Sequence, residues 1–325
     1  MKTGKRSPFQ NELQQIQEML DEQGYVANRE IVMAIYLAMK LNRPLLVEGP
    51  AGVGKTEIAK VMAQAMHTDL IRLQCYEGLD STTALYEWNY QHQLLHIKLE
   101  ENSSKSIEEK EAEIFSEKFL LKRPLLQAIS HHQPPVLLID ELDRADEEFE
   151  SFLLELLSDW QISIPEIGTI RAAHIPYVVI TSNRTRELSD AVRRRCLYLW
   201  IDYPDFEKEV AIVERKTPGI DRELAEQITR FMETVRQLKL YKTPGIAETL
   251  DWARALVTLH QTALNPDIVE QTLGVIFKDW HDIQQVKSRL SQLLEQIGVS
   301  TILTPEAINQ IRKEKQTGTD DHAAG

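Results

Sequence analysis

The stretch that decides the fold runs from Leu45 to Thr56 and reads LLVEGPAGVGKT. It opens with three apolar residues, and its last eight residues fit the pattern G-x-x-x-x-G-K-[ST] at every fixed position. A loop of this kind follows a buried strand and opens a helix, and its glycines allow a backbone whose N–H groups point inward. The positive N-terminal end of the helix adds to that field. The segment therefore predicts a loop that wraps a triphosphate.

Each member of the loop has an expected role. We expect the ammonium of Lys55 to reach the β- and γ-phosphates, and the hydroxyl of Thr56 to contact Mg²⁺. Only 13 glycines occur in the whole chain, so a chance match to this pattern is rare. The predicted ligands are therefore ATP and Mg²⁺. The predicted phosphate-binding residues are Gly49, Pro50, Ala51, Gly52, Val53, Gly54, Lys55 and Thr56.

A second apolar run, at residues 136–139, ends in Asp140 and Glu141. Because an open α/β sheet binds its ligands at the carboxyl ends of the strands, both acids are expected beside the phosphates. Asp140 suits contact with Mg²⁺, directly or through a water molecule, and Glu141 suits polarising the attacking water. The alternative is an acidic helix start, since further acids follow at Asp143, Asp146, Glu147 and Glu148.

Two more features belong to the candidate site. Asn183 follows a strand predicted at residues 177–180, where a side-chain amide either orients the attacking water or caps a turn. Arg193, Arg194 and Arg195 stand just before another predicted strand. We expect one of them to reach the γ-phosphate held by a neighbouring subunit, as an arginine finger; surface ion pairs are the alternative.

The chain alternates strand and helix patterns up to about residue 203. Strands are predicted at residues 45–47, 70–75, 136–139, 177–180 and 197–201, and such alternation favours a parallel sheet with helices on both faces. Beyond residue 203 only helical patterns occur. We therefore predict an α/β fold followed by an all-helical lid, with an N-terminal extension (1–24), a nucleotide-binding domain (25–203), the lid (204–312) and a disordered tail (313–325).

Two insertions interrupt the alternation. The partly alternating pattern of residues 82–99 predicts a hairpin, and the charge-rich residues 100–118 predict a solvated helix or loop. His92 and His96 lie in the first insertion. Because no third ligand is evident beside them, we interpret them as ordinary polar residues rather than zinc ligands.

Composition limits the partners. The formal charge is −13, with 50 acidic and 37 basic residues, which argues against non-specific binding to a phosphate backbone. Cys75 and Cys196 cannot build a disulfide framework, which indicates a reducing compartment. The longest apolar stretch, residues 31–39, is too short to cross a membrane. We expect a cytoplasmic protein with neither a nucleic-acid nor a membrane partner.

In this order and at these separations, the elements resemble the AAA+ ATPases, and within them the MoxR group, with the greatest similarity to its CoxD branch. The similarity runs from about residue 25 to residue 260. Besides the loop, the residues that carry it are 74–80 (QCYEGLD), 85–90 (LYEWNY), 119–126 (FLLKRPLL), 138–146 (LIDELDRAD), 181–188 (TSNRTREL) and 244–252 (PGIAETLDW).

The resemblance implies a ring, usually a hexamer, with ATP bound between subunits. It implies catalytic roles for Glu141 and Asn183, and an arginine finger at Arg195 or, next to it, Arg194. It also implies a chaperone activity on a metalloenzyme client, together with a partner that contains a von Willebrand factor A domain. The chain departs from the family at residues 245–249 (GIAET), where a lid helix often begins with an arginine; Arg254 is the candidate substitute.

Three other functions share these features. A nucleic-acid motor or loader uses the same fold, but the acidic charge and the lack of a basic, aromatic-laced stretch argue against it. A chelatase motor subunit shares the ring and the type of partner. A non-catalytic assembly module binds ATP as a structural ligand and has no need of Glu141 or the arginines. The sequence favours an Mg²⁺-dependent ATPase that remodels a protein client.

Overall fold

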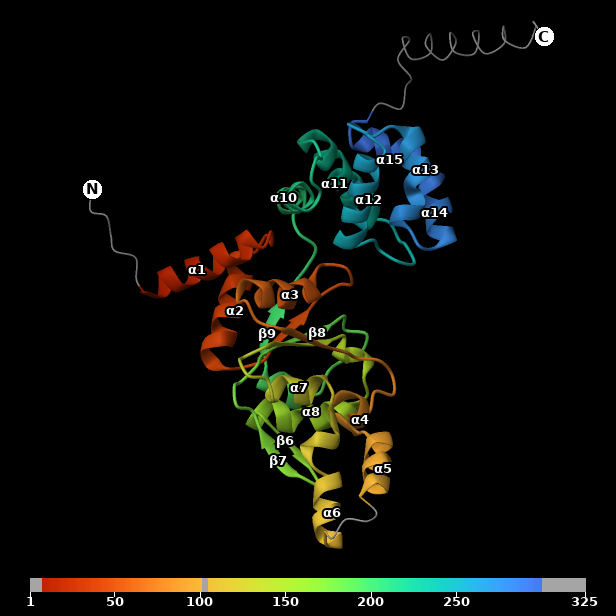
Figure 1. Ribbon diagram of the computed structural model, residues 1–325. Coiled ribbons are helices and arrows are strands. Elements are labelled where there is room, and N and C mark those ends of the chain that lie inside the picture. Colours follow the sequence, from red (N-terminus) through yellow and green to blue (C-terminus); the bar gives the residue numbers. More distant parts are fainter. Residues whose placement is uncertain (1–7, 101–104, 300–325) are drawn as a thin grey trace, which may run out of the picture. The chain divides into compact units, whose positions relative to one another are not determined.

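The computed structural model describes residues 8–100 and 105–299, and the chain divides into two compact units, Met1–Tyr203 and Pro204–Gly325 (Figure 1). The first unit is built on a five-stranded parallel sheet with the strand order β2-β5-β8-β1-β9. Its strands are β1 (Leu45–Glu48), β2 (Leu70–Gln74), β5 (Val136–Asp140), β8 (Tyr177–Ser182) and β9 (Leu197–Trp200). The predicted α/β class is confirmed. The tail predicted at residues 313–325 lies outside the described residues.

Helices cover both faces of the sheet because successive residues of a strand point to opposite sides. Leu45 and Val47 of β1 pack into a core with α1 (Pro8–Glu22), α2 (Arg29–Leu41) and α3 (Lys55–Ala65). Leu46, between them, packs into the opposite core with α7 (Pro124–Ile129) and α8 (Glu147–Asp159). Strand β1 is buried along its whole length, as a central parallel strand should be.

Local capping explains where several helices begin. The side chain of Asn28 accepts a hydrogen bond from the backbone N–H of Ile31, at 3.0 Å, and starts α2. Asp146 does the same for Phe149 at the start of α8, at 2.9 Å. An N-cap of this kind stabilises a helix by about 1 kcal/mol.

The hairpin predicted over residues 82–99 is wrong. This segment holds α4 (Ser81–Ala84), β3 (Tyr86–Trp88) and α5 (Tyr90–Leu99), and β3 pairs antiparallel with the distant β4 (Leu120–Lys122). The strand stops because the side chain of Asn89 accepts a hydrogen bond from the backbone N–H of His92 and caps α5.

The charge-rich segment that follows contains α6 (Ile107–Ile114) and the short η1 (Glu117–Phe119). Ser106 and Glu109 form a capping box at the start of α6, which explains why so polar a sequence is helical. A second antiparallel pair, β6 (Gln161–Ile164) with β7 (Gly168–Arg171), follows α8 and was not predicted.

The described part of the second unit is helical, as predicted. Its helices are α10 (Phe206–Lys216), α11 (Arg222–Arg236), α12 (Ile246–Thr258), α13 (Pro266–Ile276), α14 (Trp280–Lys287) and α15 (Leu290–Gln296). Phe231 and Trp252 are fully buried at the centre of its apolar core. Across the described ranges, no helix combines the length and the apolar character that a membrane crossing requires.

Candidate functional site

The loop between β1 and α3 depends on its glycines. Gly52 and Gly54 have φ angles of 77° and 92°, in the left-handed region that favours glycine. Gly49 is required by a close approach, since a Cβ on it would lie 1.9 Å from the carbonyl oxygen of Ile201. The backbone geometry of the loop therefore requires glycine at both fixed positions, Gly49 and Gly54, and favours it at Gly52 between them.

Lys55 is the first residue of α3, and its side chain folds back over the loop. Its ammonium donates hydrogen bonds to the carbonyl oxygens of Gly49 (2.8 Å) and Pro50 (2.6 Å), and to the side-chain oxygen of Asn183 (2.7 Å). All three acceptors are neutral. Burial lowers the pKa of Lys55, while surrounding acids, Asp143 first among them, act in the opposite direction. The loop thus contains a buried cation whose charge no hydrogen-bonded anion neutralises.

Asp140 ends β5 beside this loop and is 2% exposed. Its Oδ1 accepts hydrogen bonds from the hydroxyls of Thr56 (2.9 Å) and Thr181 (2.6 Å). Its Oδ2 accepts from Arg72, whose Nε and Nη2 lie at 3.1 and 2.5 Å. The two residues predicted to hold Mg²⁺ are therefore neighbours, and they offer the hard oxygen ligands that this ion prefers.

Glu141 follows directly, with φ 56° and ψ 50°. A left-handed conformation costs a non-glycine residue about 1 kcal/mol or more, and such residues cluster at functional sites. The backbone N–H of Glu141 donates to the hydroxyl of Thr181 at 2.8 Å. Its carboxylate accepts hydrogen bonds from Gln74 (3.1 Å), Arg144 (3.2 Å) and Asn183 (3.4 Å).

Asn183 joins the two halves of the site. Its Oδ1 accepts from Lys55 and its Nδ2 donates to Glu141, so these two contacts fix the orientation of the amide. The sheet order explains the meeting, because β8 lies between β5 and β1 and Asn183 follows the carboxyl end of β8. Four segments of the chain that are remote in sequence thus contribute side chains to one hydrogen-bonded group.

Sequence reasoning missed Arg72, Gln74 and Thr181 in this group. Arg72 and Gln74 lie on β2, where Gln74 is in register with Asp140 of β5. The sequence did contain a signal for Arg72 and Gln74. They are two residues apart near the end of a predicted strand, so their polar side chains point to the same face of the sheet. That signal becomes specific only when the neighbour of β2 is known.

The three arginines lie at the amino ends of the parallel strands, whereas the candidate site lies at the carboxyl ends. They end α9 (Asp190–Arg195), which leads into β9, and β9 runs parallel to β1 with Leu197 opposite Leu45. The phosphate-binding loop follows the far end of β1, and a four-residue strand spans about 10 Å. The backbone that carries these arginines therefore lies at the opposite end of the strands from the loop of their own chain.

The structure distinguishes the arginines by their contacts. Arg195 donates to the hydroxyl of Ser158 and, at 2.9 Å, to the carbonyl oxygen of Ala191. The side chain of Arg194 is exposed and makes no hydrogen bond or ion pair with any described residue. Its backbone is held by Arg43, which donates to the carbonyl oxygens of Arg194 (2.5 Å), Arg195 (3.1 Å) and Cys196 (3.3 Å).

Cys75, Cys196 and Arg254, which the sequence analysis considered, have ordinary structural environments. Burial raises the pKa of the Cys75 thiol to about 12 and that of Cys196 to about 12, so neither is set up as a nucleophile. Arg254 lies on α12 with an exposed side chain, and it pairs with Asp251 at 3.3 Å.

One family model and several known proteins are similar to this chain. Residues 45–200 match the model of the ATPase family associated with various cellular activities (AAA). An uncharacterized protein of Staphylococcus haemolyticus is 27% identical over 226 residues, covering 67% of this chain and 77% of that one. One of Staphylococcus saprophyticus is 23% identical over 237 residues, with 69% and 80% covered. The Thermotoga maritima RuvB Holliday junction branch migration motor gives a TM-score of 0.45 at 19% identity, with 88% of this chain and 83% of that chain covered.

Proposed function

We propose that this chain, whose residues 45–200 match the model of the AAA ATPase family, hydrolyses ATP with Mg²⁺ at sites shared between the subunits of a ring. One observation carries the hydrolysis: the amide of Asn183 contacts both Lys55 and Glu141. The residue suited to hold phosphate and the residue suited to activate water are thereby joined in one group. A module that only bound ATP would have no use for this connection.

The residues present fit the nucleotide and the ion. The buried ammonium of Lys55 has neutral oxygens as its partners, which leaves its charge for the phosphates. Thr56 and Asp140 would hold Mg²⁺, which when bound supplies positive charge that offsets the charge of the phosphates. Glu141 accepts the proton of the attacking water, and Asn183 orients both the carboxylate and the water.

The arginine that completes the site comes from a neighbouring subunit in this proposal. Support comes from the position of α9 at the sheet edge opposite the loop. Among the three arginines, Arg194 is the first candidate, because its side chain is exposed and has no partner among the described residues, whereas that of Arg193 is partly buried and that of Arg195 is engaged within its own chain. Arg43 then acts as a positioning residue, because it holds the backbone that carries Arg194.

We further propose that the work performed is the remodelling of a protein client, as in the MoxR group, with a metalloenzyme as client and a von Willebrand factor A protein as partner. The support is the sequence resemblance over about residues 25–260. The formal charge of −13 also counts against a nucleic-acid track.

Phosphate release from ATP, measured with Mg²⁺ and with EDTA, tests the hydrolysis. Glu141→Gln should bind ATP but release no phosphate, and Lys55→Ala should bind ATP poorly. Wild-type release that EDTA does not affect would contradict the Mg²⁺ requirement. For the finer proposal, a von Willebrand factor A partner should change the rate, and duplex DNA should leave it unchanged at every salt concentration; stimulation by DNA alone would favour the nucleic-acid motor.

A further inference from the structure

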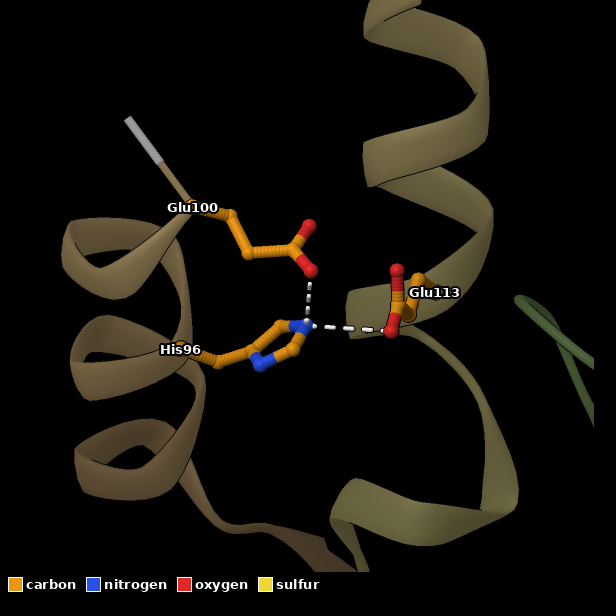
Figure 2. A group of neighbouring side chains, drawn as sticks. All are labelled: His96, Glu100 and Glu113. Atoms are coloured by element: carbon orange, nitrogen blue, oxygen red, sulfur yellow. Dashed lines mark ion pairs between the residues drawn. The ribbon is translucent and has the colours of Figure 1, made fainter. Parts of the chain in front are cut away.

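A histidine and two glutamates meet between α5 and α6, in the insertion of the first unit and apart from the phosphate-binding loop. His96 lies on α5, Glu100 is the C-cap residue that follows α5, and Glu113 lies on α6 (Figure 2). The Nε2 atom of His96 is 3.1 Å from a carboxylate oxygen of Glu113 and 3.9 Å from one of Glu100. One nitrogen and two oxygens, from three side chains, all lie within 4.8 Å of one another.

The chain fixes this arrangement from several sides. Glu100 follows His96 by four residues at the C-cap of α5, and its backbone N–H donates to the carbonyl oxygen of His96 at 3.0 Å, which keeps the two residues on the same face. The side chain of Gln93 donates to the carbonyl oxygen of Ile114 at 2.6 Å and ties α5 to the end of α6. The imidazole of His96 packs against the ring of Phe119, with centroids 5.2 Å apart. The imidazole therefore points at the two carboxylates because its other side is occupied.

The imidazole nitrogen is the atom that needs explaining. The side chain of His96 is only 16% exposed, and its Nε2 atom is buried without a hydrogen bond to any described residue. A buried nitrogen facing two carboxylates is unfavourable unless a cation or a proton lies between them. Two of the three side chains, His96 and Glu100, also line a hollow of about 460 Å³, together with Ile107 and Phe115 among others.

Lys105 already supplies one cation to the two carboxylates. Its ammonium lies 2.9 and 3.1 Å from the oxygens of Glu100 and 2.6 Å from an oxygen of Glu113. The lysine does not contact the imidazole, so it neutralises the glutamates and leaves Nε2 facing the carboxylate of Glu113, without a hydrogen bond to any described residue. The side chain of Lys105 is 40% exposed, and it is long enough to move away from the two glutamates.

We propose that His96, Glu100 and Glu113 bind a divalent transition-metal ion, of which zinc is the type, and that Lys105 neutralises the two glutamates when no metal is bound. One imidazole and two carboxylates are a common ligand set for zinc, at about 2.0–2.2 Å each. Tetrahedral ligands at that radius stand about 3.3–3.5 Å apart. The separations of 3.1 and 3.9 Å from Nε2 bracket this value, and the two carboxylate oxygens, which lie within 4.8 Å of each other, would move to meet the ion.

Such an ion would cross-link α5 to α6, because its ligands come from both helices. It would thus stabilise the packing of the insertion rather than take part in hydrolysis. The three ligands leave a fourth coordination position, which a water molecule would fill. The site stands whether or not the chain hydrolyses ATP.

Zinc binding by the full chain, after removal of metal with EDTA, tests the site by calorimetric titration. The wild type should bind one Zn²⁺ that His96→Ala loses, with affinity falling at least about tenfold. His92→Ala is the matched control: its ring also packs on Phe119, one turn earlier on α5, and it belongs to no ligand group. Asp140→Asn, combined with each variant, removes competition from the phosphate-binding site.

Two further measurements keep the outcome clear. Lys105→Met should bind zinc as tightly as the wild type or more tightly, because the substitution removes a competing cation. Zinc should raise the melting temperature of the wild type but not that of His96→Ala. Co²⁺ should give the visible absorption of a low-coordinate site only where His96 is present. Equal zinc affinity in the wild type and His96→Ala would overturn the proposal. The proposal would also be overturned if neither the wild type nor Lys105→Met bound zinc. The group would then be an ion-pair network that binds no metal.

Discussion

The ammonium of Lys55 lies 2.7 Å from the side-chain oxygen of Asn183, although the two residues are 128 positions apart in the chain. Lys55 opens the helix after β1, and Asn183 follows the neighbouring strand β8. The amide nitrogen of Asn183 lies 3.4 Å from Glu141. A change at Lys55, proposed to bind phosphate, therefore reaches Glu141, proposed to activate water, through a single side chain.

Asn183→Ala should lower the rate of hydrolysis far more than the affinity for ATP. Lys55 keeps its contacts with the carbonyl oxygens of Gly49 and Pro50, so the loop stays intact. Glu141 loses one donor, and the loss of a positioned donor typically costs about a factor of 100 in kcat. Turnover and the binding of a fluorescent ATP analogue, measured together, check this. A variant that binds ATP poorly but turns over normally would show that Asn183 serves the loop alone.

Arg72→Met should reduce the Mg²⁺ concentration needed for half-maximal turnover. The guanidinium of Arg72 lies 2.5 Å from Oδ2 of Asp140, the carboxylate assigned to Mg²⁺. A charged hydrogen bond to a half-exposed partner is worth about 1.5 kcal/mol, so the shift should be up to about tenfold. An Mg²⁺ titration of the ATPase activity measures it. A rise in the Mg²⁺ requirement would instead make Arg72 the residue that holds Asp140 in place.

Arg194→Ala should reduce turnover by about a factor of 1,000 or more, the usual effect of losing an arginine finger, without changing ATP binding. Arg193→Ala is the matched control on the same short helix. The decisive measurement mixes Arg194→Ala with Glu141→Gln, each inactive alone. Mixed rings contain sites with an intact Glu141 on one side and an intact Arg194 on the other, so activity should reappear. Mixtures that stay inactive would contradict a site shared between subunits.

Glu209→Ala should destabilise the helical unit strongly. Glu209 is fully buried on α10, and Arg236 of α11 pairs with it at 2.6 and 2.8 Å; Thr249 of α12 donates to it at 2.9 Å. Removing one partner of a buried pair leaves an uncompensated charge, at a cost of about 3–5 kcal/mol. Denaturant unfolding measures the change, with Arg254→Ala as the control at an exposed pair. A loss below about 1 kcal/mol would show that the other acceptors of Arg236, the carbonyl oxygens of Pro244 and Gly245 and the hydroxyl of Thr249, compensate for the missing carboxylate.

The sequence predicts the sheet and its loop well because each is encoded locally. The apolar run before Gly49 and the motif after it specify β1, the loop and α3 without reference to the rest of the chain. Asp140 and Glu141 are predictable for a related reason, since parallel strands carry their functional residues at one edge.

The remainder depends on contacts between distant residues. Nothing in the sequence near Arg72 indicates that its neighbour is Asp140, because that contact follows from the pairing of β2 with β5. The hairpin predicted over residues 82–99 was wrong because β3 pairs with β4, which lies more than 30 residues later in the chain. His96 lacked a third ligand for the same reason, until α6 brought Glu113 to it.

The most direct test of the central claim is ATP turnover measured against protein concentration, with particle size followed in parallel, for the wild type and Glu141→Gln. A site shared between subunits predicts that specific activity rises as the ring assembles. It also predicts that Glu141→Gln assembles with ATP but turns over none of it. A wild-type rate per chain that stays constant from monomer to ring would contradict the account, because one chain alone would then hold every residue that hydrolysis needs.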